Sequence, residues 1–202
     1  MAHQQKHTIL TLVLGVIACT VANITWAKRY PDDPFAWQHK PMDAKEIGTT
    51  AGQMQFSVLG TTVISSSNDD PYLGGKIGSD YMLNEYGALR FYVAQDLFEP
   101  NGGSIEHRFT SFRFGSSWHL NPYRAVDIGS FIDAGVLVVD FIKGKSGDKA
   151  PEVTLGGFMM YHIDSALFIR AEMERAWCNV EIDGIDTKQH RTALSLGLGM
   201  AF

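Results

Sequence analysis

The feature that most constrains this chain is the strict alternation of its last nine residues, LSLGLGMAF. Successive side chains of an extended strand point to opposite faces, so residues two apart share a face. One face is then large and apolar throughout, and it is formed by Leu194, Leu196, Leu198, Met200 and Phe202. Chain ends are usually poorly ordered and wet, so an end this apolar must have its face covered.

The same two-residue period recurs from residue 52 onward, and no helical period persists for three turns. Eight strands are predicted, at residues 53–65, 76–83, 87–97, 106–119, 126–141, 152–162, 167–180 and 188–202. The predicted connections are alternately long and short. Residues 66–75, 98–104, 142–151 and 181–186 form the longer ones. This pattern indicates an up-and-down barrel with its long loops at one rim.

The face opposite the apolar one combines glycine and serine with charged residues. A water-soluble ligand-binding barrel would instead carry long polar side chains outside and few glycines. The composition therefore favours a narrow lumen, in which charges must be paired, and an apolar exterior in lipid, where only a closed barrel satisfies every backbone group. A soluble jelly roll or sandwich is the alternative. The predicted lumen network consists of Arg90, Arg113, Asp133, Arg170, Glu172 and Glu174.

Aromatic residues near the strand ends are predicted to lie at the membrane interfaces. They are Tyr81, Trp118, Tyr123, Phe141 and Trp177.

The N-terminal 27 residues have the features of a secretory signal peptide: Lys6, an apolar run, and small residues before a cleavage site after Ala27. An uncleaved membrane anchor is one alternative, and lipidation at Cys19 after processing is another. Residues 28–51 contain three prolines and are predicted to be an irregular extension. Cleavage after Ala27 would leave Cys178 as a single cysteine, so no intrachain disulfide is expected.

The last strand also resembles the assembly signal of bacterial outer-membrane proteins: a polar residue, a glycine, and two apolar residues of which the last is a terminal Phe. Ser195, Gly197, Met200 and Phe202 occupy these places, with Met200 where an aromatic is commoner. Residues 52–202 resemble the small eight-stranded outer-membrane barrels, which include the OmpA transmembrane domain, OmpX-like proteins and opacity-type surface proteins. The resemblance implies an all-β, eight-stranded antiparallel up-and-down transmembrane β-barrel in the bacterial outer membrane. It also implies recognition of the last strand by the outer-membrane assembly machinery.

Some barrels of this size modify lipid A, using His with Ser or Asp near the outer rim. One such group is close together in the sequence but falls at a periplasmic turn in this topology: His162, Asp164 and Ser165. Two further histidines, His107 and His190, lie nearer the outer rim. Their conceivable partners are Ser104 and Asp186. Asp69, Asp70, Asp183 and Asp186 lack the spacing of a calcium loop. We therefore expect no catalytic residues, no metal and no cofactor.

An eight-stranded barrel has an interior just wide enough for side chains to fill, which predicts a mostly closed lumen. The leading functional hypothesis is a non-enzymatic outer-membrane protein, structural or surface-exposed, whose loops contact lipopolysaccharide or external ligands. The alternatives are a narrow porin and a lipid A-modifying enzyme. The net charge of −5 argues against a nucleic-acid partner, and a monomer is expected.

Overall fold

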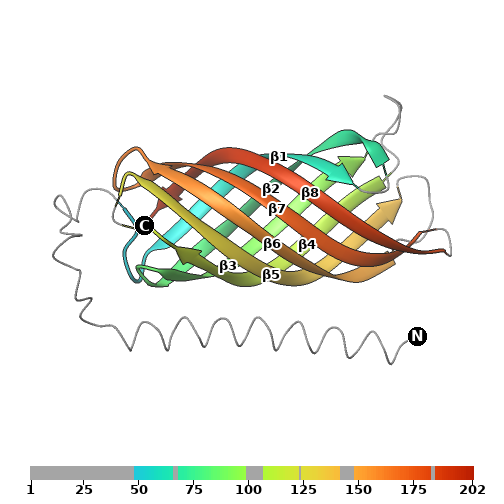
Figure 1. The fold of residues 1–202 in the computed structure, drawn as a ribbon, viewed down its shortest axis with the longest axis horizontal. Coiled ribbons are helices and arrows are strands. Elements are labelled where there is room, and N and C mark those ends of the chain that lie inside the picture. The colour runs from blue at the N-terminus through green and yellow to red at the C-terminus, as the bar shows by residue number, and fades with distance from the viewer. Residues whose placement is uncertain (1–47, 66–67, 99–106, 123, 142–147, 183–184) are drawn as a thin grey trace.

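A computed structural model describes residues 48–65, 68–98, 107–122, 124–141, 148–182 and 185–202. The predicted signal peptide and residues 28–47 of the predicted extension lie outside these ranges. Eight strands make up the fold (Figure 1). They are β1 (Met54–Ser65), β2 (Asn68–Asn84), β3 (Gly87–Phe98), β4 (His107–His119), β5 (Val126–Phe141), β6 (Asp148–His162), β7 (Leu167–Ile182) and β8 (Ile185–Ala201).

Each strand pairs antiparallel with the next, and β8 pairs back onto β1, which closes the barrel. The closing seam runs from Gln55 opposite Ala201 to Ser65 opposite Arg191. At its end, Met54 and Phe202 exchange two backbone hydrogen bonds, at 3.1 and 2.8 Å. The predicted eight-stranded antiparallel up-and-down barrel is confirmed.

Two predicted long loops are wrong, because the strands continue through them. β2 begins at Asn68 rather than at residue 76, and β7 and β8 are separated only by residues 183–184. Between β1 and β2 the regular pairing extends to Val63 opposite Tyr72. After a shift in register it continues with Ser65 opposite Asn68. Pro71 falls in this irregularity, where a residue without an N–H group costs no ladder hydrogen bond. Turn-forming residues here accompany a bulge instead of a loop.

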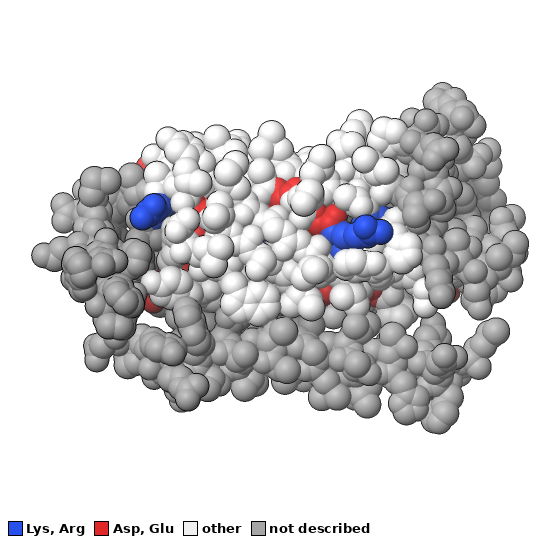
Figure 2. Space-filling view, in the orientation of Figure 1, with Lys and Arg blue, Asp and Glu red and all other residues white. Residues whose placement is uncertain are grey.

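The exterior of the barrel is apolar. On β8 and at the residue that follows it, the side chains of Leu194, Leu196, Leu198, Met200 and Phe202 are all exposed, at 45 to 72%. The surface of the strands seen in Figure 2 is mostly uncharged. No helix among the described residues is long and apolar enough to cross a membrane.

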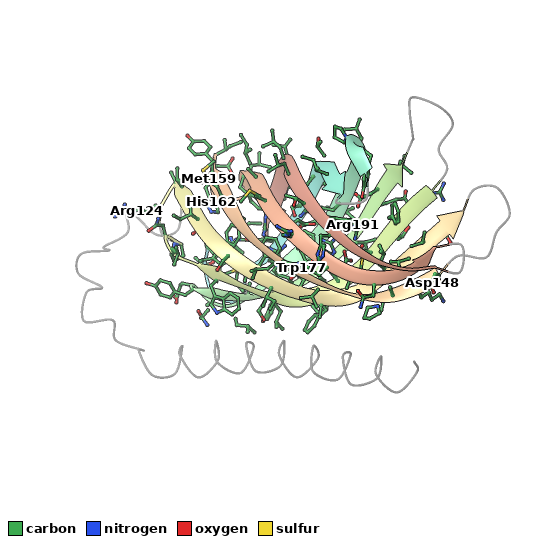
Figure 3. The ribbon with its side chains drawn as sticks, turned by 45° about the vertical axis from the view of Figure 1, so that its right-hand side comes forward. Arg124, Asp148, Met159, His162, Trp177 and Arg191 are labelled. Carbon is green, nitrogen blue, oxygen red and sulfur yellow. The ribbon has the colours of Figure 1, made fainter. Side chains whose placement is uncertain are left out.

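Two clusters of apolar side chains fill the lumen, a feature that the predicted inward face of small and charged residues did not include. We call the rim with connections 85–86, 120–125 and 163–166 the turn rim, and the opposite rim the loop rim; Arg124 and Asp148 mark the two in Figure 3. The loop-rim cluster consists of Val63, Tyr72, Phe109, Leu137, Val139, Ala150, Cys178, Val180 and Ala193. The turn-rim cluster consists of Phe131, Phe158, Met160, Phe168 and Ala201.

Inward-facing glycines make room for the largest lumen side chains. Gly199 lies directly across the ladder from Phe168, and Gly129 from Phe158. A Cβ atom added at either glycine would collide with the facing phenyl ring. At these two positions the lumen therefore has the dense packing of a protein interior, because each of the two glycines is matched to one ring on the next strand.

Candidate functional site

The lumen holds a buried layer of charged side chains between the two apolar clusters. The structure brings together all six residues of the predicted network, and each of them is at most 7% exposed. Five further charged residues join them. The complete set consists of the cations Lys76, Arg90, Arg113, Arg170 and Arg191 and the carboxylates Asp80, Asp96, Asp133, Glu152, Glu172 and Glu174.

The half of the network nearer the turn rim is built around Glu172. Arg170 Nε donates to Glu172 Oε1 at 2.6 Å, and Arg90 Nη2 lies 3.3 Å from the same oxygen. Arg90 Nε donates to Asp133 Oδ1 at 3.2 Å, and Arg170 also pairs with Asp80. The inward positions of four strands, β2, β3, β5 and β7, supply these groups, so this half ties together strands that are not neighbours in the sheet.

The half nearer the loop rim is built around Arg113. Its Nη1 donates to Glu174 Oε1 at 2.6 Å, and its Nη2 lies 3.3 Å from Glu152 Oε1. Glu152 pairs also with Arg191, whose Nη1 lies 3.1 Å from Asp96 Oδ2. Each carboxylate in this half is therefore matched to at least one guanidinium, as buried charges require.

Lys76 joins the two halves. Its Nζ pairs with Glu172 on one side and lies 2.6 Å from Glu174 Oε2 on the other. No other cation among the described lumen residues pairs with both of these glutamates. Removing Lys76 would split one continuous network into two.

Aromatic rings cover the network on both sides. The Arg90 guanidinium carbon lies 3.8 Å from the centroid of Phe131, and that of Arg170 lies 4.8 Å from Phe158, both in the turn-rim cluster. In the loop-rim cluster, the Arg191 guanidinium carbon lies 5.7 Å from Phe109. Cations stacked on ring faces are stabilised electrostatically where water is excluded.

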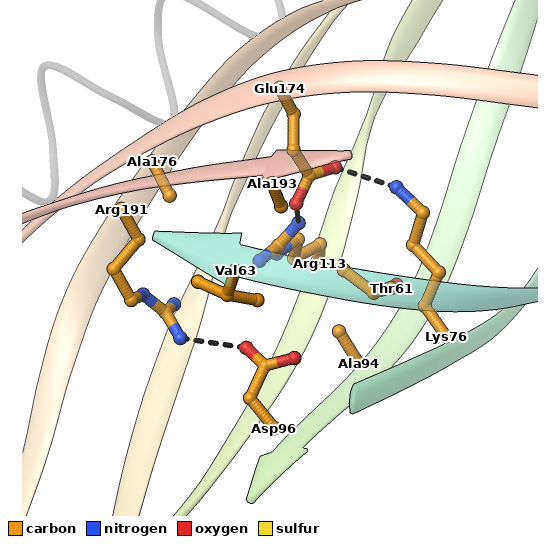
Figure 4. Close-up of a pocket in the computed structure, with 10 residues that line it drawn as sticks. All are labelled: Thr61, Val63, Lys76, Ala94, Asp96, Arg113, Glu174, Ala176, Arg191 and Ala193. Carbon is orange, nitrogen blue, oxygen red and sulfur yellow. Dashed lines mark hydrogen bonds and ion pairs between the residues drawn. The ribbon is translucent and has the colours of Figure 1, made fainter. Parts of the chain in front are cut away.

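The space left inside this layer is very small. A cavity of about 10 Å³ lies among residues of β1, β2, β3, β4, β7 and β8, including Lys76, Arg113 and Arg191 (Figure 4). A volume of that size corresponds to about one water molecule. The cavity within the charged layer is therefore too small to hold a solute larger than water.

The predicted lumen network did not include five of these residues: Lys76, Asp80, Asp96, Glu152 and Arg191. The signal that could have found them is the same two-residue period. Asp96 shares its face with Arg90, three inward positions away on β3, and Arg191 shares its face with Ser195 on β8. Lys76 and Glu152 stood at the very start of predicted strands, where boundaries are least certain.

A second buried polar cluster lies at the turn rim. His119 Nδ1 is 2.6 Å from Asp127 Oδ2, and Ser117 Oγ lies 3.4 Å from His119 Nε2. Asp127 also accepts a hydrogen bond from the backbone N–H of Asn121, at 3.2 Å. Ser117, His119 and Asp127 are each at most 2% exposed, so the hydroxyl is closed to a substrate. We interpret the cluster as structural, because it fixes the β4–β5 turn.

The last residues of the predicted extension pack against this turn. Thr49 is fully buried, and its N–H donates to Pro122 O at 2.7 Å. Its hydroxyl accepts a hydrogen bond from Gln55 Nε2 at 3.1 Å. Gly52, with a φ of 80°, turns the chain toward β1, a conformation that favours glycine. Residues 48–52 thus cover part of the mouth at the turn rim.

The other candidate residues are described only in part, and Asp164 lies in the turn between β6 and β7. Asp164 Oδ1 accepts hydrogen bonds from the N–H groups of Ala166 and Leu167, both at 2.7 Å, which is the role of a turn former. These bonds lower the pKa of Asp164. Ser104, Asp183 and Tyr123 lie outside the described residues, as do the side chains of Asp69, Asp70, His107, Phe141 and Asp186. No group of three or more His, Cys, Asp or Glu side chains in the described ranges could hold a metal ion.

The four residues of the predicted assembly signal divide between the two faces of β8. Ser195 faces the lumen, where its hydroxyl lies 3.1 Å from that of Thr61. Gly197 lies across the ladder from Leu59, and a Cβ atom there would collide with β1. Met200 and Phe202 are exposed on the exterior. Recognition of this strand by an assembly machinery stays a prediction.

Two of the predicted interfacial aromatics, Tyr81 and Trp118, lie near the turn rim, where Tyr161 is also exposed. Trp177 lies five residues before the end of β7. It does not mark the strand end as predicted, because β7 continues to Ile182.

No protein-family model and no curated protein sequence matches the chain. Solved structures do match it. Neisserial surface protein A is 12% identical, with a TM-score of 0.57, over 74% of this chain and 96% of that one. The Ail protein of Yersinia pestis is 14% identical, with a TM-score of 0.48 over 76% and 100% of the two chains. The N-terminal barrel domain of Pseudomonas aeruginosa OprF is 15% identical, with a TM-score of 0.46 over 75% and 98%. The first of these likenesses shows a shared fold, that of the small eight-stranded outer-membrane barrels.

Proposed function

We propose that this protein, which has the fold of the small eight-stranded outer-membrane barrels, is a non-enzymatic integral protein of the bacterial outer membrane. In this proposal the turn rim faces the periplasm, and the loop rim presents structural or binding surfaces to the outside. The loop connections and the outer ends of the strands contact lipopolysaccharide or external ligands. The barrel acts as a rigid support for those contacts.

The observation that carries the proposal is the sealed lumen. Eleven charged side chains are paired in one network, apolar clusters cover it on both sides, and the cavity within it holds about one water molecule. A solute path would require several buried ion pairs to separate at once. Breaking one buried pair typically costs about 3–5 kcal/mol, so a conducting state would be scarcely populated.

The exterior supports the membrane location. The exposed apolar residues of β8 span about 20 Å along the barrel axis, from a rise of about 3.3 Å per residue and a tilt of about 40°. Transmembrane strands need about 9–11 residues, whereas β7 has 16 residues and β8 has 17. The excess lies toward the loop rim, so that part of the barrel would project beyond the bilayer.

Planar-bilayer conductance tests the proposal, using the full chain after its insertion has been verified by the heat-dependent shift of folded barrels on gels. We expect no stepwise conductance from the wild type. Steady channels that change in Arg113→Ala would favour the narrow porin and contradict the proposal. Mass spectrometry of lipid A from cells with and without expression tests the enzyme alternative, and an altered acyl profile would overturn the non-enzymatic assignment.

A further inference from the structure

One cation on the membrane-facing surface differs from every cation in the lumen. Arg175 is exposed on the outer face of β7, and no carboxylate lies within ion-pair distance of it among the described residues. Its cross-strand neighbours are uncharged: Leu155 on β6 and Thr192 on β8. By contrast, Arg108 lies directly opposite Asp140 on the next strand. Among the described residues, Arg175 is therefore a guanidinium without an anionic partner.

Along the barrel axis, Arg175 lies at the edge of the apolar exterior that is nearer the loop rim. On its own strand it follows the outward series Leu167, Ile169, Ala171 and Met173. On β8 its neighbour Thr192 comes one outward position before Leu194, where the exposed apolar series begins. An arginine facing lipid costs about 2–4 kcal/mol at the midplane and close to nothing at the interface. Arg175 thus lies at the depth of the lipid headgroups on the loop-rim side.

The surroundings of Arg175 suit an anionic headgroup. Its guanidinium carbon lies 5.9 Å from the ring centroid of Trp177, a residue typical of membrane interfaces. Thr192, opposite it, adds a hydroxyl to the same face of the sheet. Arginine binds phosphate through two parallel N–H donors and is the residue favoured wherever phosphate is recognised.

We propose that Arg175, with Trp177 and Thr192 beside it, binds the phosphate of an outer-leaflet glycolipid of the lipid A type, whose acyl chains lie on the apolar band below. This inference rests on the proposed membrane location and adds a defined lipid site on the strands. It places one lipopolysaccharide contact on the barrel wall, in addition to those of the loops. Charge complementarity selects the phosphate, and the adjoining apolar band selects a lipid over a free anion.

The test is native mass spectrometry of the full-length folded protein in detergent, titrated with bisphosphorylated lipid A or with the same lipid after removal of its phosphates. The wild type is expected to bind the phosphorylated form about tenfold more tightly, or by about 1.4 kcal/mol, because the phosphate accepts charge-assisted hydrogen bonds from the guanidinium. Arg175→Gln should abolish this preference. Lys149→Gln, which removes another exposed cation nearer the loop rim, should keep it.

Equal binding of the two lipids by the wild type, or an unchanged preference in Arg175→Gln, would overturn the inference. A third arm adds inorganic phosphate at the same concentration as lipid A. Displacement of lipid A at equal concentration would identify a free-anion site and contradict the lipid assignment, whereas retention supports it. A protein that fails to insert would refute the proposed function instead, and the gel shift detects that failure separately.

Discussion

Replacing Lys76 with methionine removes the one cation that joins the two halves of the lumen network while keeping a side chain of similar length. In the wild type, Lys76 Nζ contacts Glu172 and lies 2.6 Å from Glu174. These glutamates occupy successive inward positions on β7, and because both contact the same ammonium nitrogen, their facing oxygens are no more than about 5 Å apart. Without the ammonium group, their repulsion at that distance is about 3 kcal/mol at an effective dielectric constant of about 20. With the lost attraction added, we expect Lys76→Met to lower the free energy of unfolding by about 3–5 kcal/mol, the range typical for a broken buried ion pair.

The assay is urea-induced unfolding in lipid vesicles, followed by tryptophan fluorescence. Lys149→Met is the matched control, because this lysine is exposed, and its effect should stay within about 0.5 kcal/mol. Adding Glu174→Gln to Lys76→Met removes one of the opposed charges, so the double variant should recover about 1–2 kcal/mol relative to additivity. A cost below about 1 kcal/mol for Lys76→Met, or strict additivity in the double variant, would refute the reasoning.

Two smaller predictions concern single contacts. Gly199→Ala places a methyl group against the ring of Phe168 and should lower the free energy of unfolding by about 1–3 kcal/mol. Gly60→Ala should lower it less, because the added atom meets no neighbour closer than 3.8 Å. Equal urea midpoints for the two variants would contradict this difference. The pKa of Asp164 is lowered by two backbone N–H donors, so its carboxylate stabilises the turn above about pH 4 and loses that effect as the pH falls through the lowered pKa. A carboxyl titration followed by NMR should therefore have its midpoint below about 4, and a midpoint at or above that value would be inconsistent with the turn geometry.

The faces of the strands were predictable from the sequence because the two-residue period is a local property. Arg90 and Arg170 were placed in the lumen by their alternation with Phe91 and Ile169, and the structure buries both arginines and exposes both apolar neighbours. Strand lengths were less predictable. The run from Asn68 to Gly75 is rich in turn-forming residues, yet pairing with β1 extends β2 through it.

The packing of the lumen could not be predicted from local patterns. Phe131, Phe158 and Phe168 occupy inward positions, where their size conflicts with a narrow interior. Each is accommodated because the residue directly across the ladder is a glycine: Gly156, Gly129 and Gly199. That match depends on the register between strands, which no single strand contains. Most partners of the buried charges are non-local for the same reason, whereas Arg170 and Glu172 pair within β7.

The most direct test of the account is the accessibility of consecutive positions on β8 to lipid. Single cysteines introduced at residues 193–196 and 198 in a Cys178→Ser background would each carry a fluorophore, with quenching measured from brominated acyl chains in vesicles. The account predicts strong quenching at positions 194, 196 and 198 and weak quenching at 193 and 195. Quenching without this alternation, or stronger at the odd-numbered positions, would contradict an apolar exterior in lipid around a charged and sealed lumen.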